Sequence, residues 1–344
     1  MKRRVTMADV AEEIGVAAST VSRALRNDPR ISAKVRQEVQ EKAVSLGYRP
    51  NPLLSALMAN RSKSESEDVS GAETLALLTD YGGGVGWRDK DVCCWEYEGM
   101  VKRAHELGFV LEEFALPDYA GDLNRAREVI RARGVRGVLL GFSRSRNRRV
   151  LLEAETEFVV SGLSAYFREV GVDRANFHGL YNVRLALGEM RKLGYRRIGL
   201  VVPELNNRLS GFQWTSGYLD WQRNLSAKDC CAPFVPDGGG VESAFQTWFR
   251  REKPHALLVY KLPVKSWLAK MSLRIPEDVG LALLFRTQKE MESAAGIDGN
   301  LGMVGSAAVD LVVEGLYGSR TGLPEHPKEV LIKGDWLDGP TLNR

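Results

Sequence analysis

The stretch TMADVAEEIGVAASTVSRALRNDPRISAKVRQEVQEKAVSLGYRPNPLLSAL, residues 6–57, predicts three short helices near the start of the chain. Each has apolar residues at the spacing of one helix face: Met7, Val10, Ala11 and Ile14, then Val21 and Leu25, then Val35, Val39, Ala43 and Leu46. Gly15 is expected to end the first helix and Ser32 to cap the third. Two helices joined by a glycine turn and braced by a third are typical of a helix-turn-helix, whose second helix enters the DNA major groove.

The charge distribution favours a nucleic-acid-binding module in the same stretch. Residues 1–61 hold 11 Lys and Arg against 6 Asp and Glu, a net charge of +5, whereas the whole chain carries only +4. The rest of the chain therefore sums to −1, and the positive charge is concentrated where DNA phosphates would be contacted. The alternative is a solvated basic surface without a partner, but this charge coincides with the helix-turn-helix pattern.

The same stretch resembles the headpiece of the LacI/GalR family of bacterial transcription regulators. The match is carried by Asp9-Val10-Ala11, Gly15-Val16, Thr20-Val21-Ser22-Arg23, Leu25, Asn27, Ile31-Ser32, Arg36 and Leu46-Gly47-Tyr48-Arg49-Pro50-Asn51. The family typically has Ser where this chain has Ala17, so Ser19 or backbone N–H groups are expected to replace that cap and phosphate contact. The resemblance implies a DNA-binding headpiece at residues 1–50.

The resemblance also implies a set of DNA contacts. These are Thr6, Ala18, Ser19, Thr20, Ser22, Arg23, Asn27, Ser32, Arg36, Tyr48, Asn51, Leu54 and Leu57. Arg23 is expected on the exposed face of the second helix, where it suits guanine O6 and N7. Asn51 and Pro52 favour the start of a helix too short to be stable alone. The family has a hinge helix here, at 51–60, and Leu57 falls where its leucine enters the minor groove.

A polar linker at 61–72 leads into a predicted core at 73–338. Apolar, β-rich runs recur along this core: Leu75–Thr79, Phe109–Phe114, Gly137–Phe142, Phe158–Ser161, Ile198–Val202, Ala256–Tyr260, Val279–Phe285 and Val330–Lys333. Amphipathic helical patterns separate most of them, which predicts an α/β core of parallel sheets covered on both faces. The resemblance implies two doubly wound parallel-sheet subdomains, as in type I periplasmic binding proteins. They are expected at about 73–173 with 300–328, and at about 174–299 with 329–338.

Ligands of open α/β sheets bind beyond the carboxyl ends of the strands. The residues expected to bind a ligand there are Asp80, Tyr81, Trp87, Phe142, Ser143, Arg208, Trp214, Lys261 and Arg286. The tryptophans suit stacking on a sugar or another flat face, although core packing is the ordinary role of a tryptophan. The family has neutral or acidic groups where this chain has Lys261 and Arg286, which favours a carboxylate or phosphate on the ligand. Pairing of one of these cations with Asp80 is the alternative.

Several classes of protein are disfavoured by composition and motifs. No apolar run is long enough for a membrane span and no secretory leader is recognisable, so a cytoplasmic bacterial protein is expected, associated with the nucleoid when bound, and a periplasmic solute-binding protein is excluded. Cys93-Cys94 and Cys230-Cys231 are expected to be plain thiols, with a thiol or metal sensor as the alternative. No P-loop, histidine cluster or nucleophile elbow is present, so no enzyme, cofactor or metal is predicted.

The sequence therefore predicts a homodimeric transcription regulator, a repressor, that binds a palindromic double-stranded DNA operator. Its effector is expected to be a sugar, sugar acid or sugar phosphate bound in the core cleft. The competing hypothesis is the same headpiece on a core whose cleft has lost ligand binding, an architectural or constitutive regulator. That hypothesis rests on an arginine of the family that Phe212 replaces in this chain.

Overall fold

The computed structural model describes residues 7–25, 31–46, 73–80, 86–143, 157–163, 171–286, 293–318 and 320–343. The chain divides into two compact units, Met1–Gly71 and Ala72–Arg344. Each unit has hydrophobic core clusters of its own. In the described part of the chain, no helix is both long and apolar enough to cross a membrane.

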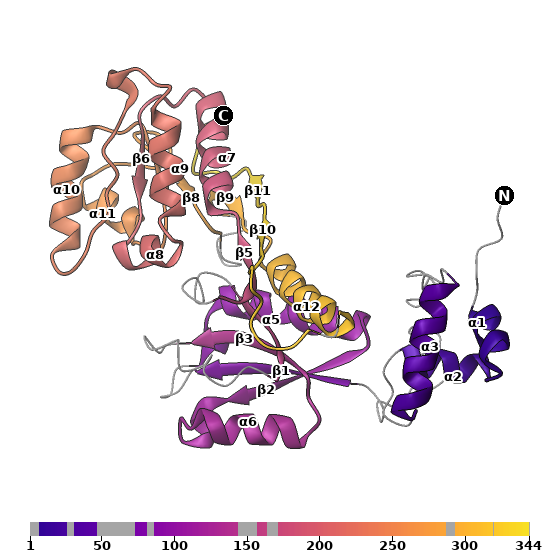
Figure 1. Ribbon diagram of the computed structural model, residues 1–344. Helices are drawn as coiled ribbons and strands as arrows, with labels where there is room; N and C mark the ends of the chain where they lie inside the picture. The colour runs from indigo at the N-terminus through magenta and orange to yellow at the C-terminus, as the bar shows by residue number, and fades with distance from the viewer. Residues whose placement is uncertain are drawn as a thin grey trace, which may run out of the picture. The chain divides into compact units, whose positions relative to one another are not determined.

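The described part of the first unit consists of three helices, as predicted (Figure 1), and they enclose a small apolar core. The helices are α1 (Met7–Ile14), α2 (Ala18–Leu25) and α3 (Ala33–Ser45). Their fully or nearly buried residues are Val10, Ala11, Val21, Ala24, Val39 and Ala43. Gly15 ends α1 with φ of +74°, and its N–H donates to the Ala11 carbonyl at 2.9 Å. The amide of Val35 donates to the Ser32 hydroxyl at 3.4 Å, which makes Ser32 the cap of α3.

The second unit is built on two sheets. The first has six parallel strands in the order β10-β5-β4-β3-β1-β2: β1 (Glu73–Asp80), β2 (Phe109–Ala115), β3 (Gly137–Ser143), β4 (Val159–Leu163), β5 (Asp173–Phe177) and β10 (Glu329–Ile332). The second has the order β11-β9-β8-β7-β6: β6 (Ile198–Val201), β7 (Ala256–Val259), β8 (Gly280–Leu283), β9 (Ala295–Asp298) and β11 (Asp335–Leu337). β11 alone of these strands is antiparallel to its neighbour.

Helices cover both faces of each sheet, as expected for doubly wound subdomains (Figure 1). The first sheet packs on α5 (Asp91–Glu106) and α12 (Leu301–Tyr317) on one face and on α6 (Leu123–Ala132) on the other. The second sheet packs on α7 (Gly179–Lys192) and α9 (Gln213–Gln222) on one face and on α10 (Val241–Glu252) and α11 (Val264–Lys270) on the other. The short elements are α8 (Glu204–Leu209), η1 (Trp87–Asp89), η2 (Leu116–Tyr119) and η5 (Ala227–Asp229).

The boundary between the two subdomains differs from the predicted one. Both β5 and β10 belong to the first sheet, whereas the prediction placed residues 174–299 and 329–338 in the second subdomain. All four residues of β10 pair with β5, and the side chains of Arg174 and Glu329 form an ion pair at 3.0 Å. The chain therefore crosses between the sheets after β5, after β9 and between β10 and β11.

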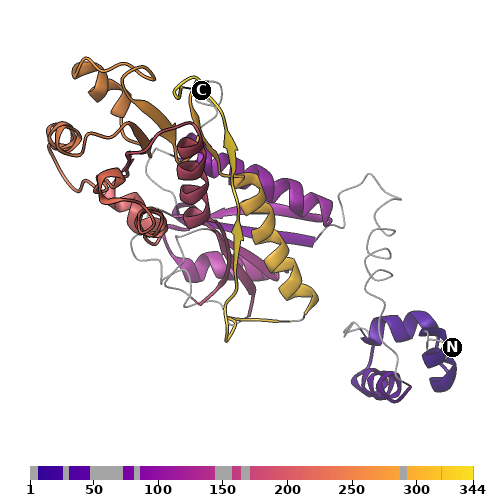
Figure 2. The ribbon, with the colours of Figure 1, turned by 90° about the horizontal axis from the view of Figure 1, so that it is seen from above.

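Two helices of the first subdomain, α5 and α12, lie side by side in backbone contact (Figures 1 and 2). Glycines make this approach possible. A Cβ atom on Gly305 would overlap the carbonyl group of Glu96, and one on Gly99 would overlap the carbonyl group of Gly302. The small residues therefore determine how closely α12 approaches α5, and with it the position of Glu96.

Candidate functional site

The second helix of the headpiece presents one buried face and one exposed face. Val21 and Ala24 are fully buried against α1 and α3, Thr20 and Leu25 are half-buried, and Arg23 is exposed. Arg23 therefore stands on the solvent side of α2, where a helix inserted into a groove would meet base edges. The predicted contacts Ala18, Ser19 and Ser22 are also on α2.

Two further predicted DNA contacts lie around the start of α3. Ser32 is exposed and caps the helix. The half-buried Arg36 donates from its guanidinium to the Ile31 carbonyl at 3.0 Å, so it holds the segment before α3 in place. The other predicted contacts fall outside the described residues: Thr6, Asn27, Tyr48, Asn51, Leu54 and Leu57.

A cavity of about 160 Å³ lies between the two subdomains of the core. Its lining comes from both of them: Lys90, Val92, Cys93, Glu96, Phe177 and Leu301 from the first, and Asn206, Leu209, Ser210, Trp214, Tyr260, Lys261 and Phe285 from the second. A molecule bound in this cavity would touch both subdomains at once.

Aromatic side chains form the walls of the cavity. The ring centroids of Trp214 and Tyr260 are 4.6 Å apart, and those of Phe177 and Phe285 are 4.9 Å apart in an edge-to-face arrangement. Phe177 also stacks on Trp214 at 5.9 Å, which joins the two pairs across the subdomains. Trp214 is 3% exposed and its indole Nε1 has no hydrogen-bond partner in the described part of the protein. A buried donor left in this way is costly.

A carboxyl group is buried in the lining. Glu96, on α5, is 2% exposed, and its side chain forms no hydrogen bond or ion pair with another described residue. Removal from water raises the pKa of Glu96 to about 8, so the carboxyl is mainly protonated at neutral pH. A protonated carboxyl offers one O–H donor and an acceptor oxygen to a bound molecule.

Cationic side chains lie at the exposed edge of the cavity. Lys90 precedes α5 and Lys261 follows β7, and both are exposed. Lys261 has a left-handed backbone with φ of +53°, and its Nζ is 5.2 Å from the centre of the Tyr260 ring. Burial raises the pKa of Tyr260, and burial raises the pKa of the Cys93 thiol to about 12. The lysines are therefore the charged groups of this lining at neutral pH.

The structure brings only part of the predicted ligand set together, because Trp214 and Lys261 alone of that set line the cavity. Trp87 and Phe142 are buried in the first core with ring centroids 4.7 Å apart, and the Trp87 indole donates to Glu113 at 2.7 Å. Both side chains pack in the core and do not line this cavity. Asp80 ends β1 and Ser143 ends β3, but neither lines the cavity; Tyr81 falls outside the described residues.

The two predicted arginines also lie outside the lining. Arg286 is 3% exposed, and its backbone N–H donates to Ile297, so the residue before it, Phe285, faces the cavity in its place. Arg208 is paired with Glu204 at 3.1 Å and is largely exposed. Of the two cations on which the prediction of an anionic ligand rested, Lys261 lines the cavity, together with Lys90, and Arg286 does not.

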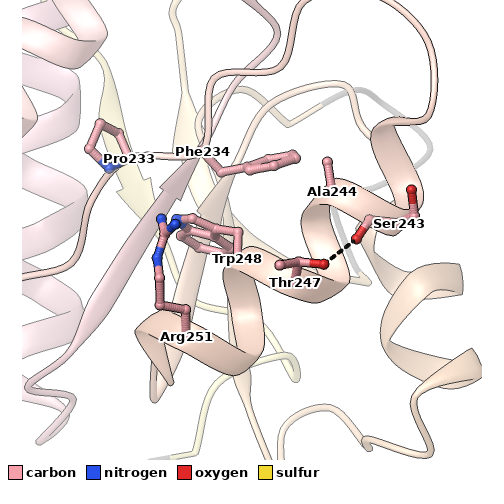
Figure 3. A pocket seen from close by; sticks show the side chains of 7 residues that line it. All are labelled: Pro233, Phe234, Ser243, Ala244, Thr247, Trp248 and Arg251. Carbon is pink, nitrogen blue, oxygen red and sulfur yellow. Dashed lines mark hydrogen bonds between the residues drawn. The ribbon is translucent and has the colours of Figure 1, made fainter.

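A second hollow, of about 480 Å³, is lined by the second subdomain alone (Figure 3). Its lining residues are Pro233, Phe234, Ser243, Ala244, Thr247, Trp248 and Arg251. Its polar side chains already have partners: the Trp248 indole donates to Ala232 at 2.8 Å and the Thr247 hydroxyl to Ser243 at 3.1 Å. The cavity between the two subdomains, whose lining includes the unpaired Trp214 indole and Glu96 carboxyl, is the better candidate for a ligand site.

Comparison with known proteins identifies both parts of the chain. Residues 6–51 match the family described as bacterial regulatory proteins, lacI family, and residues 187–335 match the periplasmic binding protein-like domain. The HTH-type transcriptional regulator AglR of Rhizobium meliloti is 28% identical over 209 residues, 57% of this chain and 52% of AglR. GalS of Salmonella typhimurium is 43% identical over 77 residues, 22% of this chain and 23% of GalS. The chain thus spans about half the length of AglR.

Solved structures share the fold over nearly the whole chain. The transcriptional regulator CelR–cellobiose complex has a TM-score of 0.57 at 16% identity and covers 98% of this chain and 100% of CelR. The lac repressor dimer bound to operator and the anti-inducer ONPF has a TM-score of 0.55 at 18% identity, with 98% and 99% coverage. The chain therefore carries a lacI-family helix-turn-helix domain followed by a periplasmic-binding-protein-like core. The resemblance of the headpiece to the lacI family is thus confirmed, and the two relatives named here, AglR and GalS, are HTH-type transcriptional regulators.

Proposed function

We propose that this protein is a homodimeric transcription repressor that binds a palindromic operator through its headpieces and a small effector in its core cleft. The observation that carries the proposal is the orientation of α2, with Val21 and Ala24 buried and Arg23 directed to solvent, within a match to the lacI family. The lac repressor structure contains a dimer on an operator, which supports the same assembly for a chain of the same fold. A cytoplasmic, nucleoid-associated location follows from this role.

The effector role is supported by the composition of the cavity. Because residues of both subdomains line it, a ligand binds best to one arrangement of the two and shifts their equilibrium toward it. The CelR structure holds cellobiose, so proteins of this fold bind small molecules. The competing hypothesis, a cleft that has lost ligand binding, predicts that the buried polar groups of the cleft have hydrogen-bond partners within the protein. The unsatisfied Trp214 indole and the buried Glu96 carboxyl oppose it.

Selection of bound sequences from random DNA, with and without a panel of small molecules, tests the proposal. A palindromic consensus whose recovery changes with one class of small molecule is expected. Arg23→Ala should weaken binding to that consensus by about 1–3 kcal/mol and relax discrimination at one base pair in each half-site. Lys34→Ala is the matched control, since Lys34 is also exposed but lies on α3. Equal weakening on all sequences would reduce Arg23 to a phosphate contact.

The proposed hinge helix, residues 51–60, is tested separately because it lies outside the described residues. Leu57→Ala should weaken binding to the consensus strongly, leave non-specific binding almost unchanged, and reduce bending of the operator. A flexible step such as CG or TA at the dyad would make insertion of the leucine less costly. Wild-type affinity and bending in the Leu57→Ala variant would exclude the wedge.

A further inference from the structure

We infer that the cavity takes a small ring-shaped hydroxy acid, with its ring against Trp214, a hydroxyl group on Glu96 and its acidic group at Lys90 and Lys261. This inference rests on the proposed role of the cleft as the effector site. It names the chemistry of the effector, and each part of that chemistry follows from a different part of the lining.

The ring is inferred from the walls. Phe177, Trp214, Tyr260 and Phe285 all line the cavity, and their ring centroids lie 4.6–6.2 Å from their neighbours. A small space bounded by flat apolar faces favours a flat, compact ligand over a flexible chain, because the ligand buries its faces with little loss of conformational freedom. At about 160 Å³ the space suits a single ring.

The hydroxyl group of the ligand is inferred from the buried carboxyl of Glu96. The Glu96 carboxyl is buried in the lining and has no described polar partner, and the titratable or charged side chains of the same lining are Cys93, Tyr260, Lys90 and Lys261. With the pKa of Glu96 raised to about 8, the carboxyl is mainly uncharged at neutral pH and pairs best with a neutral group that both donates and accepts. A hydroxyl is such a group.

The acidic group is inferred from the edge. Among the residues that the structure describes, the lining contains two lysines and no arginine, and both lysines are exposed while Glu96 is buried. A ligand entering past Lys90 and Lys261 is favoured if it carries negative charge and disfavoured if it carries positive charge. The lysines act as point charges and accept either a carboxylate or a phosphate. An ammonium ligand in contact with Glu96 is the opposing possibility, since aromatic walls also suit cations.

Thermal shift and calorimetric titration of the full-length protein test the inference with matched probes. The acidic probes are galacturonate, galactose 6-phosphate and 4-hydroxybenzoate. Their neutral counterparts are galactose and 4-hydroxybenzyl alcohol, and their cationic counterparts are galactosamine and tyramine. At least one acidic probe should bind tenfold or more tightly than its neutral and cationic counterparts. The sugar and benzoate arms separate a saturated ring from an aromatic one, and the phosphate arm separates the two acidic groups.

Variants assign each contact. Lys90→Gln with Lys261→Gln should reduce the affinity of the acidic probe tenfold or more, while Lys265→Gln, an exposed lysine outside the lining, should leave it unchanged. Glu96→Gln keeps a donor and an acceptor and should retain affinity within about threefold, whereas Glu96→Met should lose tenfold or more. A cationic ligand on Glu96 would instead be lost in Glu96→Gln.

The outcomes separate this inference from the proposed function. Preferred binding of a neutral or cationic probe, lost in Trp214→Ala, would overturn the inference and leave the effector role intact. If no probe binds and DNA binding is indifferent to all of them, the inference fails, and a broader search for any DNA-release effect then decides the proposed function on its own. Binding of an acidic probe that is unaffected by the lysine and Glu96 variants would overturn the inferred mode of binding.

Discussion

Replacing the buried carboxyl of Glu96 by an amide should raise the free energy of unfolding of the core above that of wild type, by a margin that grows as pH rises. The unfolded chain releases this proton near the ordinary pKa of 4.5, whereas burial raises the folded pKa to about 8. Glu96 therefore lowers the stability of the wild-type core progressively as pH rises from about 4.5 to about 8, by up to about 5 kcal/mol at roughly 1.4 kcal/mol per pH unit. The Glu96→Gln variant has no carboxyl to titrate at this position. Its free energy of unfolding should therefore equal that of wild type near pH 5 and exceed it by several kcal/mol at pH 8.5.

Urea unfolding followed by tryptophan fluorescence measures this difference in the core alone, because all seven tryptophans lie after residue 86. Subtracting the variant from wild type at each pH cancels groups that titrate in both, such as His178, whose pKa is lowered by burial. Glu98→Gln is the matched control, since Glu98 is exposed on the same helix and should not change the slope. Parallel stability curves for wild type and Glu96→Gln between pH 5 and 8.5 would refute the reasoning.

Three further results are expected. Gly305→Ala should destabilise the core by about 1–3 kcal/mol or more, because the added Cβ overlaps the Glu96 carbonyl, while Gly188→Ala, with open space around it in α7, should be neutral or slightly stabilising in the same urea titration. Trp214→Phe should leave the stability of the core nearly unchanged, since it removes an unsatisfied donor, and should lower the affinity for the effector measured by calorimetry. Lys42→Met breaks an exposed ion pair between α3 and α1 and should cost the headpiece less than about 1 kcal/mol by circular dichroism.

The headpiece could be predicted from the sequence because the signals for its short helices, the apolar spacing and the residues that end each helix, lie within the helices or next to them. Each helix places small apolar residues at one face, and Gly15 occupies the left-handed position that ends α1. The strands that were missed lack such a signal. β5 reads Asp-Arg-Ala-Asn-Phe, and its Asp173 is buried because it accepts from the Lys328 amide at 2.7 Å. β11 has only three residues, too few for an alternating pattern, and β9 reads Ala-Gly-Ile-Asp, with a single β-branched residue.

The residues of the candidate site that follow the ends of strands could be predicted from the sequence. The residue that lies within a helix, Glu96, could not. Lys261 lies two residues beyond the end of β7, so the rule that ligands of open sheets bind at the carboxyl ends of strands found it. Glu96 lies inside α5, and its burial requires the close approach of α12 at Gly305, a contact between residues 209 positions apart. A signal was nevertheless present. Cys93, Glu96 and Met100 fall at i, i+3 and i+7, so a carboxyl group interrupts the apolar face of this helix.

If the proposed effector binds in the cavity, the crossings between the sheets are where it would act on the two subdomains. The His178 amide after β5 donates to the Ile332 carbonyl of β10 at 2.7 Å, and the Asn300 side chain before α12 donates to the Lys333 carbonyl at 3.0 Å. The amide of Gly334 donates to Asn182 of α7 at 2.8 Å. All three connections are thus tied by hydrogen bonds and should move as one hinge. A ligand held by Glu96 on one side and Trp214 on the other can bias that hinge by no more than its difference in affinity for the two arrangements, typically about 1–3 kcal/mol.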